Sequence, residues 1–338
     1  MENKKKKISS NTFLLLVTIA LFVVMYVAGM IIFKDKGFAK PQMFFNLFIS
    51  NAGLLVIACG MTIVMITGGI DISVGSVTAL VCMCAAYAME TKGMSAWTAV
   101  AISLIIGLLF GLVQGYLVTY LEIQPFIVTL AGMFFGRGMT AVVSTDMISI
   151  KNELFLKWAN YRINLPVGST NKKGAFIPAY IYPTVVIALL VVILISVMLK
   201  YTKFGRNLYA IGGNQQSAVM MGLNVKSTKM KAYLLDGFLA GLGGFLFCLN
   251  SCAGFVEQAK GLEMDAISAA VIGGTLLSGG VGTVIGTLFG VLIKGTISSL
   301  ITTQGTLSSW WVRITLSALL CFFIVLQAVI AARKEKNK

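Results

Sequence analysis

Apolar stretches long enough to cross a lipid bilayer recur along the whole chain. A transmembrane helix needs about 20 consecutive apolar residues. Only 12% of the 338 residues are charged, whereas a soluble domain carries about 25%. The sequence therefore predicts an all-α integral membrane protein, a single membrane domain over residues 1–338, with about ten transmembrane helices. These predicted helices cover residues 12–33, 44–67, 72–89, 96–119, 125–143, 181–199, 232–252, 265–279, 281–301 and 310–332.

Lysine and arginine concentrate in residues 4–7, 200–231 and 333–338. Membrane proteins keep such basic segments on the cytoplasmic side. Ten crossings place both termini on one side, so we expect both termini in the cytoplasm. The net charge of +15 then faces anionic lipid headgroups, and no basic surface interleaved with aromatic residues indicates nucleic-acid binding.

Small residues spaced four apart indicate closely packed helices and an internal repeat. Such spacing places glycines on one helix face, where backbones approach closely in lipid. The fourth and ninth predicted spans share this pattern, and the third and eighth each begin with an aspartate followed by a serine. The chain is thus expected to consist of two five-helix halves, about 12–143 and 181–332, in an inverted repeat. The packing glycines are Gly107, Gly111, Gly115, Gly282, Gly286 and Gly290.

Two glycine-rich segments are expected to be broken or re-entrant. Gly68, Gly69 and Asp71 lie between the second and third spans, and the eighth span, residues 265–279, is short and rich in glycine. An ionised carboxylate near the bilayer centre costs roughly 2.5–3.5 kcal/mol, so it is usually paired or functional. Asp71 either caps the following helix at the membrane surface or belongs to a transport route, and the depth of Asp71 is not fixed by hydropathy.

Several kinds of chemistry are absent from the sequence. The chain contains no histidine, which excludes His-based zinc sites and Ser-His or Cys-His nucleophiles. The six cysteines lie in predicted spans, where they are expected to pack as small apolar residues. No Gly-Lys dipeptide occurs, so no Walker A loop is present. We expect no enzyme activity, metal or cofactor in this chain, with any ATP and Mg²⁺ bound by a partner subunit.

Two long loops are of different kinds: one separates the two halves, and the other follows the sixth predicted span. The outer loop, about 144–180, is long enough to form small surface helices where another protein docks. The inner loop, about 201–231, contains a short helix that Asn214 would cap and Gly222 would end. That helix either inserts into a groove on another subunit or lies flat on the membrane interface.

Five segments, in order along residues 45–330, resemble the ribose/xylose-type sugar ABC transporter permeases. GMFFGRG and GTLSSWW are most similar to the galactofuranose branch of that family, in which two different permeases pair. The segments are GGIDISVGS (68–76), LAGMFFGRG (130–138), FGRNLYAIGGN (204–214), DAISAAVIGGTLLSGGVGTVIGTLFG (265–290) and GTLSSWW (305–311).

The resemblance implies a permease subunit in a bacterial inner membrane. A separate ATPase would drive it, a second permease would pair with it, either a related chain or a second copy, and an extracytoplasmic binding protein would deliver a monosaccharide such as galactofuranose. The residues that match the family's ATPase coupling segment are Gly205, Arg206, Gly212, Gly213, Asn214, Ala218 and Gly222.

A neutral sugar needs hydrogen-bonding groups and an apolar or aromatic wall rather than fixed charge. Asp71 and Asp236 are the carboxylates predicted inside the membrane, and either one would be structural if it paired with Arg137, Lys294 or Arg313. This structural role is expected for Asp236, with lining of the route as the alternative. The alternatives are an ion-coupled secondary transporter that uses Asp71 or Asp236, and a channel or scaffold without pumping. The candidate residues of the sugar pathway are Asn51, Thr67, Gly68, Gly69, Asp71, Ser73, Ser76, Gln114, Asn250, Ser268, Thr275 and Ser278.

Overall fold

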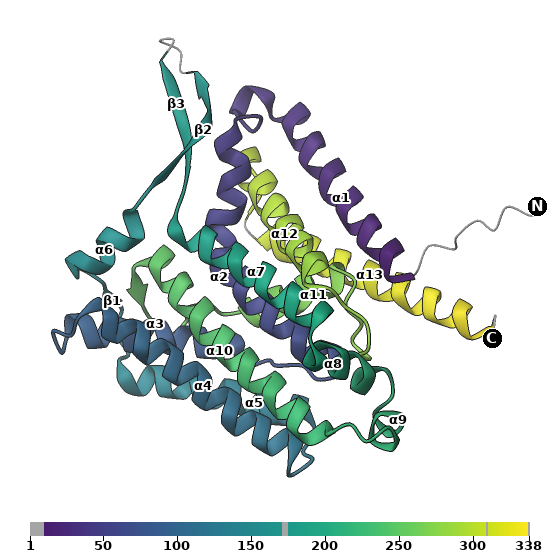
Figure 1. Ribbon diagram of the computed structural model, residues 1–338. Coiled ribbons are helices and arrows are strands. Elements are labelled where there is room, and N and C mark those ends of the chain that lie inside the picture. Colours follow the sequence, from purple (N-terminus) through teal and green to yellow (C-terminus); the bar gives the residue numbers. More distant parts are fainter. Residues whose placement is uncertain (1–9, 171–174, 309, 337–338) are drawn as a thin grey trace, which may run out of the picture.

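Helices make up most of the computed structural model, which describes residues 10–170, 175–308 and 310–336 (Figure 1). Eight of the described helices contain a segment long and apolar enough to cross a membrane, so the predicted helical membrane fold is confirmed at this level. They are α1 (Ser10–Ile32), α2 (Pro41–Ile66), α4 (Ala96–Thr119), α5 (Pro125–Val143), α7 (Pro183–Tyr201), α10 (Val225–Ser251), α12 (Val284–Gln304) and α13 (Trp310–Lys336). The basic residues 4–7 lie outside the described residues.

Two further apolar helices are shorter and occupy the third and eighth predicted spans. They are α3 (Val74–Glu90) and α11 (Leu262–Ile272). Residues 273–283, after α11, form no helix or strand. Gly274, Gly279 and Gly280 take positive φ angles of 92°, 85° and 72° there, a conformation that glycine adopts without steric cost. The eighth predicted span is therefore only partly helical.

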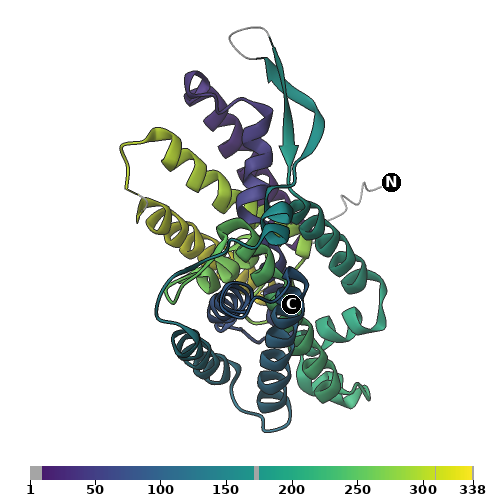
Figure 2. The ribbon, with the colours of Figure 1, turned by 90° about the vertical axis from the view of Figure 1, so that its left-hand side faces the viewer.

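The remaining elements are small and lie at the two ends of the bundle. The antiparallel β2–β3 hairpin lies beside α2 at one end of the bundle (Figures 1 and 2), where the side chain of Gln42 forms two hydrogen bonds with the backbone of Tyr180. We call this end the hairpin end and the opposite one the α8–α9 end. The sequence predicted small helices in the outer loop, but it did not predict this hairpin or α8. The elements are η1 (Lys34–Lys36), α6 (Glu153–Asn160), α8 (Lys203–Gly213), α9 (Gln215–Met220), β1 (Ile148–Ser149), β2 (Ile163–Thr170), β3 (Phe176–Ile181) and β4 (Ala253–Gly254).

Helices α2 and α10 form the centre of the bundle. In the most apolar segment of α2, 83% of the residues are buried, and in that of α10 72% are buried. The corresponding share is 17% for α1 and for α13. α4 packs on α10, and α12 packs on α2. α3 contacts α4, α5 and α10, while α11 contacts α12, α13 and α2. The outer helices therefore present apolar surface to lipid or to another membrane protein.

Glycines allow the tightest of these crossings. A Cβ atom on Gly111 would lie 3.1 Å from the Cα atom of Gly237, and one on Gly107 would lie 2.8 Å from the Cα atom of Gly241. In the second half, a Cβ atom on Gly290 would lie 3.0 Å from the Cα atom of Ala269. The glycines of α4 thus pack against α10, and Gly286 and Gly290 of α12 pack against α11 and the residue that ends it. The prediction that Gly282 shares their helix face is wrong, because α12 begins only at Val284 and Gly282 lies in the irregular segment before it.

Candidate functional site

The two irregular segments, residues 67–73 and 273–283, contact one another through their backbones. The amide of Gly280 donates a hydrogen bond to the carbonyl of Ile66, at 2.9 Å. A Cβ atom on Gly279 would lie 2.8 Å from the nitrogen of Gly68, and both residues have positive φ angles. The breaks between α2 and α3 and between α11 and α12 therefore form one layer of backbone.

Asp71 lies in the first break and is 4% exposed. Its Oδ1 atom accepts hydrogen bonds from the amide of Ser73, at 2.7 Å, and from the hydroxyl of Ser73, at 2.6 Å. Gln114 of α4 donates to that same hydroxyl oxygen at 2.8 Å. Asp71 thus shapes the turn before α3, as an Asx turn does, and it is also tied to α4 in the interior.

The expected pairing of Asp71 or Asp236 with a basic residue is wrong. Asp236 on α10 is fully buried, and neither of its carboxyl oxygens has a hydrogen-bond partner among the described residues. Its neighbour Gly237 packs on Gly111 of α4, one turn before Gln114, which bonds Ser73 beside Asp71, so both carboxyl groups belong to the same part of the interior. Lys294 instead forms an ion pair with Asp265, at 3.2 Å. Hydropathy places a residue along a helix but not around it, so the sequence did not show which carboxylate faces the cations.

A second polar cluster joins α11, α12 and α2. Lys294 pairs with Asp265 and also donates to Oδ1 of Asn51, at 3.4 Å. The amide nitrogen of Asn51 donates to the carbonyl of Leu47, at 2.8 Å. Asn51, a pathway candidate, therefore belongs to this cluster and not to the one around Asp71.

The other pathway candidates divide into three groups. Ser76 donates to the carbonyl of Ser73, at 2.7 Å, and so lies beside Asp71. Thr67 and Ser268 are buried, and the hydroxyl of Thr275 is buried without a partner among the described residues. Asn250 and Ser278 are exposed. The structure brings together Asp71, Ser73, Ser76 and Gln114, but it does not gather the second-half candidates around them.

An apolar groove of 480 Å³ adjoins this group and runs along α3, α4 and α5. Gln114 contributes the amide, Phe110 and Phe135 contribute aromatic wall, and the residues that line it carry no charge. Gly132 of α5 also lines the groove, and a Cβ atom there would lie 3.4 Å from Cβ of Ser73. The sequence analysis did not single out Gly132, although its spacing of four from Gly136 is a detectable signal.

The segment predicted to couple to an ATPase forms α8 and α9. Thr202 accepts a hydrogen bond from the amide of Gly205 at 3.1 Å and begins α8. Asn214 accepts from the amide of Ser217 at 2.8 Å and begins α9. Gly222 has a φ angle of 76° and follows α9, whereas Arg206 donates only a long 3.4 Å bond to the carbonyl of Tyr201.

Side chains of α9 point in two directions. Ala218 is fully buried against Ile211 and Val225. Met220 is 88% exposed, and its neighbours Val219 and Met221 are 56% and 65% exposed. α9 thus anchors itself through Ala218 and offers apolar surface through the three residues that follow.

α8 is joined directly to the layer formed by the two breaks. A Cβ atom on Gly212 would overlap the carbonyl oxygen of Ile66 and the amide of Gly280, so only glycine fits there. The hydroxyl of Tyr209 donates to the carbonyl of Gly282, at 2.8 Å. A Cβ atom on Gly213 would meet nothing within 4 Å, whereas one on Gly280 would lie 2.8 Å from the Cα atom of Gly213. Displacement of α8 would therefore act on the ends of α2 and α12.

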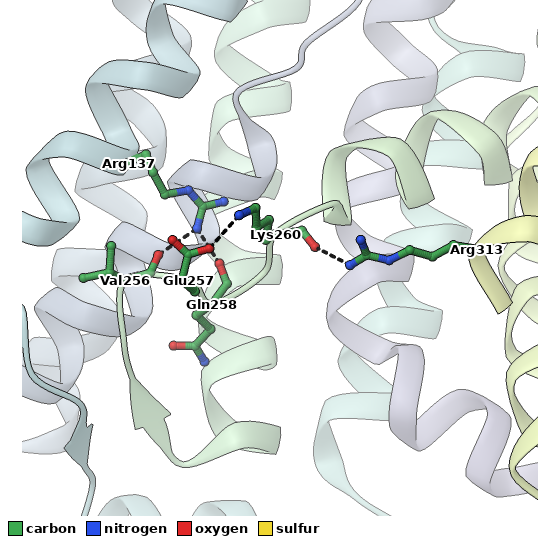
Figure 3. Close-up of polar contacts among 6 residues, drawn as sticks. All are labelled: Arg137, Val256, Glu257, Gln258, Lys260 and Arg313. Carbon is green, nitrogen blue, oxygen red and sulfur yellow. Dashed lines mark hydrogen bonds and ion pairs between the residues drawn. The ribbon is translucent and has the colours of Figure 1, made fainter. Parts of the chain in front are cut away.

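At the hairpin end, two arginines hold the connection between α10 and α11 (Figure 3). Arg137 of α5 donates to the carbonyls of Val256 and Gln258, at 2.9 and 2.6 Å. Arg313 of α13 reaches the carbonyl of Lys260, at 3.5 Å. The ammonium group of Lys260 bonds Glu257 and holds the pKa of that carboxyl below its usual range. These cations are therefore engaged near the surface, away from Asp71 and Asp236.

Comparison with known proteins identifies the family of this chain. Residues 43–324 match a family described as the permease component of branched-chain amino acid transport systems. Curated relatives include the inner membrane ABC transporter permease protein YjfF of Escherichia coli (strain K12), with 41% identity over 93% of this chain and 91% of that protein. The chain belongs to the ribose-type family of sugar ABC permeases.

Other relatives of this permease are named for sugars. The ribose import permease protein RbsC of Escherichia coli (strain K12) is 34% identical over 86% of each chain. The fructose import permease protein FruG of Bifidobacterium longum (strain NCC 2705) is 33% identical over 95% of this permease and 93% of that protein. No solved structure matches. The permease is therefore a multi-pass membrane subunit of a sugar ABC importer.

Proposed function

We propose that this permease imports a monosaccharide, galactofuranose or a related pentose or hexose, and is driven by a separate ATPase. The observation that carries the proposal is the arrangement of α8 and α9. α9 exposes Met220 on a connection outside the long helices, and α8 contacts the layer of backbone at the two helix breaks through Gly212. A docked ATPase could thus move the ends of α2 and α12.

The route of the sugar follows from the groove at Gln114. A hydrogen-bonding amide, two aromatic rings and the absence of charge suit a neutral sugar. Phe135 on α5 is 62% exposed in the single chain. We infer that a second permease, either a related chain or another copy, covers this face and closes the route.

The contacts also favour two inverted five-helix halves. α3 contacts α4, α5 and α10, and its proposed counterpart α11 contacts α12, α13 and α2. In this scheme α2 and α10 are counterparts, as are α4 and α12. With both termini in the cytoplasm, α8 and α9 face the ATPase, and the β2–β3 hairpin faces an extracytoplasmic sugar-binding protein.

An ion-coupled secondary transporter is the second candidate, because Asp71 and Asp236 share the interior. Two observations favour the ATP-driven importer. The relatives with up to 41% identity are ABC permeases, and an ion-coupled carrier needs no capped helix with exposed methionine at its α8–α9 end.

The test is sugar uptake into proteoliposomes that hold the full complex, with its binding protein and internal ATP. Met220→Glu should reduce ATP-dependent uptake about tenfold or more, because it places a charge in an apolar contact. Met94→Glu, at an exposed methionine near the hairpin end, is the matched control and should retain uptake. Galactofuranose, ribose and xylose are compared as substrates.

Equal uptake by the Met220→Glu variant and the control would argue against docking through α9. Accumulation that ignores ATP and collapses with an ion gradient would replace the pump with secondary transport. Ala218→Arg is a poor probe, because Ala218 is fully buried and arginine would disrupt α9 itself.

A further inference from the structure

Asp71 and Asp236 form a carboxyl pair with no described basic partner in the interior of the bundle. The exposed fractions are 4% for Asp71 and 0% for Asp236. Gly60 of α2 makes room for the Asp236 carboxyl, since a Cβ atom on Gly60 would overlap Oδ1 of Asp236. Two ionised carboxylates in such a place repel strongly, and pairs of this kind keep one proton between them.

The hydrogen bonds of the two residues are unequal. Oδ1 of Asp71 accepts two bonds from Ser73, and Gln114 orients the Ser73 hydroxyl. Neither oxygen of Asp236 receives a hydrogen bond from the described residues. Donors stabilise the ionised form of a carboxyl group, whereas a carboxyl without donors is more stable when protonated.

No positive charge from the described part of the chain faces the pair. Among the described residues, the ionisable group that faces the pair is the hydroxyl of Tyr233, which is buried and unpartnered beside Gly69. α2 presents Gly60, and the first break and α4 contribute Ser73 and Gln114. Lys229, on the same helix as Asp236, instead donates to Gln215 at 2.7 Å.

We propose that Asp71 and Asp236 form a buried proton-binding site, in which Asp236 carries the proton and donates a hydrogen bond to Asp71. That bond ties α10 to the break before α3. The proton stays with the permease and is not the coupling ion of transport. Loss of the proton leaves two facing negative charges, so the hydrogen bond between α10 and the break before α3 is lost as the pH rises.

Infrared spectroscopy of the reconstituted complex tests the proton directly. At neutral pH the wild type should show the carbonyl band of a protonated carboxylic acid, and Asp236→Asn should remove it. Glu263→Gln is the matched control, because Glu263 also has a buried oxygen without a partner. Absence of the band, or its loss in Glu263→Gln alone, would overturn the proposal.

Uptake across a range of pH tests the consequence, and this arm rests on the proposed importer function. Asp236→Asn should keep wild-type uptake within about twofold at neutral pH, because the carboxamide N–H replaces the donated O–H. Wild-type uptake should fall at high pH, where the pair loses its proton, and Asp236→Asn should abolish this fall. Asp71→Asn should reduce uptake about tenfold or more, since it removes the negative charge and replaces one accepting oxygen with an N–H donor, which ends the charge-assisted hydrogen bond.

The outcomes distinguish failure of the proton-binding site from failure of the proposed importer function. Equal effects of Asp71→Asn and Asp236→Asn, or an unchanged pH profile in Asp236→Asn, would overturn the proton site. Loss of wild-type uptake when Na⁺ is replaced by choline would assign the pair to a metal cation instead. If the wild-type complex imports no sugar, the proposed function fails, while the infrared result still decides the proton.

Discussion

The crossing of α4 and α10 offers the sharpest test of the packing. Gly107→Ala adds one methyl group where the carbonyl of Gly237 and the Cα atom of Gly241 already lie. These neighbours are backbone atoms, so the helices themselves must separate. Overpacking costs ~1–3 kcal/mol, and a rigid backbone neighbour places this change near the upper end.

The matched control is Gly138→Ala on α5, where an added Cβ meets nothing within 4 Å. Both substitutions gain the preference of alanine over glycine in a helix, ~0.8–1 kcal/mol. The net expectation is a loss of ~2 kcal/mol for Gly107→Ala and a gain of up to ~1 kcal/mol for Gly138→Ala. At ~2 °C per kcal/mol for a long chain, the melting temperatures fall by about 4 °C and rise by up to about 2 °C.

The assay uses the native cysteines. Cys59, Cys82 and Cys248 are fully buried, so a thiol-reactive dye reports their exposure as the detergent-solubilised protein unfolds. Cys321 is exposed and is replaced by serine to lower the background. If both alanine variants shift the melting temperature by the same amount, backbone contact at Gly107 does not limit the stability of the bundle.

Two further predictions concern the cations. Arg137→Gln removes hydrogen bonds of 2.9 and 2.6 Å to the α10–α11 connection, so the rate of amide hydrogen exchange in residues 253–261 should rise about tenfold or more. Arg313→Gln breaks one 3.5 Å contact and should change that rate little. Equal effects of the two variants would contradict the view that Arg137 holds this connection. Lys294→Met leaves Asp265 without its 3.2 Å partner and should cost ~1 kcal/mol, or about 2 °C. Adding Asp265→Asn should restore most of that loss in the same melting assay. A double variant as unstable as the single one would show that the loss does not come from the unpaired Asp265.

Hydropathy predicts the long helices well, because burial in lipid requires continuous apolar segments. The breaks were also detectable, since Gly68, Gly69 and the glycines after Ile272 interrupt those segments. The cap of α9 at Asn214 followed from the preference of asparagine for helix starts. In each case the signal is local in sequence.

Long-range features were not predictable in this way. The Asp71–Asp236 pair depends on the rotation of α10 against the first break, and the ion pair of Asp265 with Lys294 depends on how α11 meets α12. The β2–β3 hairpin pairs segments of mixed polarity whose strand pattern is weak. The exposure of Met220 beside the burial of Ala218 required the fold of α9.

The joint at Gly212, Ile66 and Gly280 is made by main-chain atoms. The joint requires glycine at Gly212, but none of its three residues lines the groove at Gln114 and Phe135, so substitutions in the groove leave this joint untouched. In the proposed importer, the groove that would bind the sugar and the joint that would transmit motion from the ATPase therefore lie in separate parts of the chain. A permease with this arrangement can acquire a new sugar specificity by side-chain replacement in the groove while it keeps the same ATPase. Directed evolution of specificity should therefore begin with α3, α4 and α5.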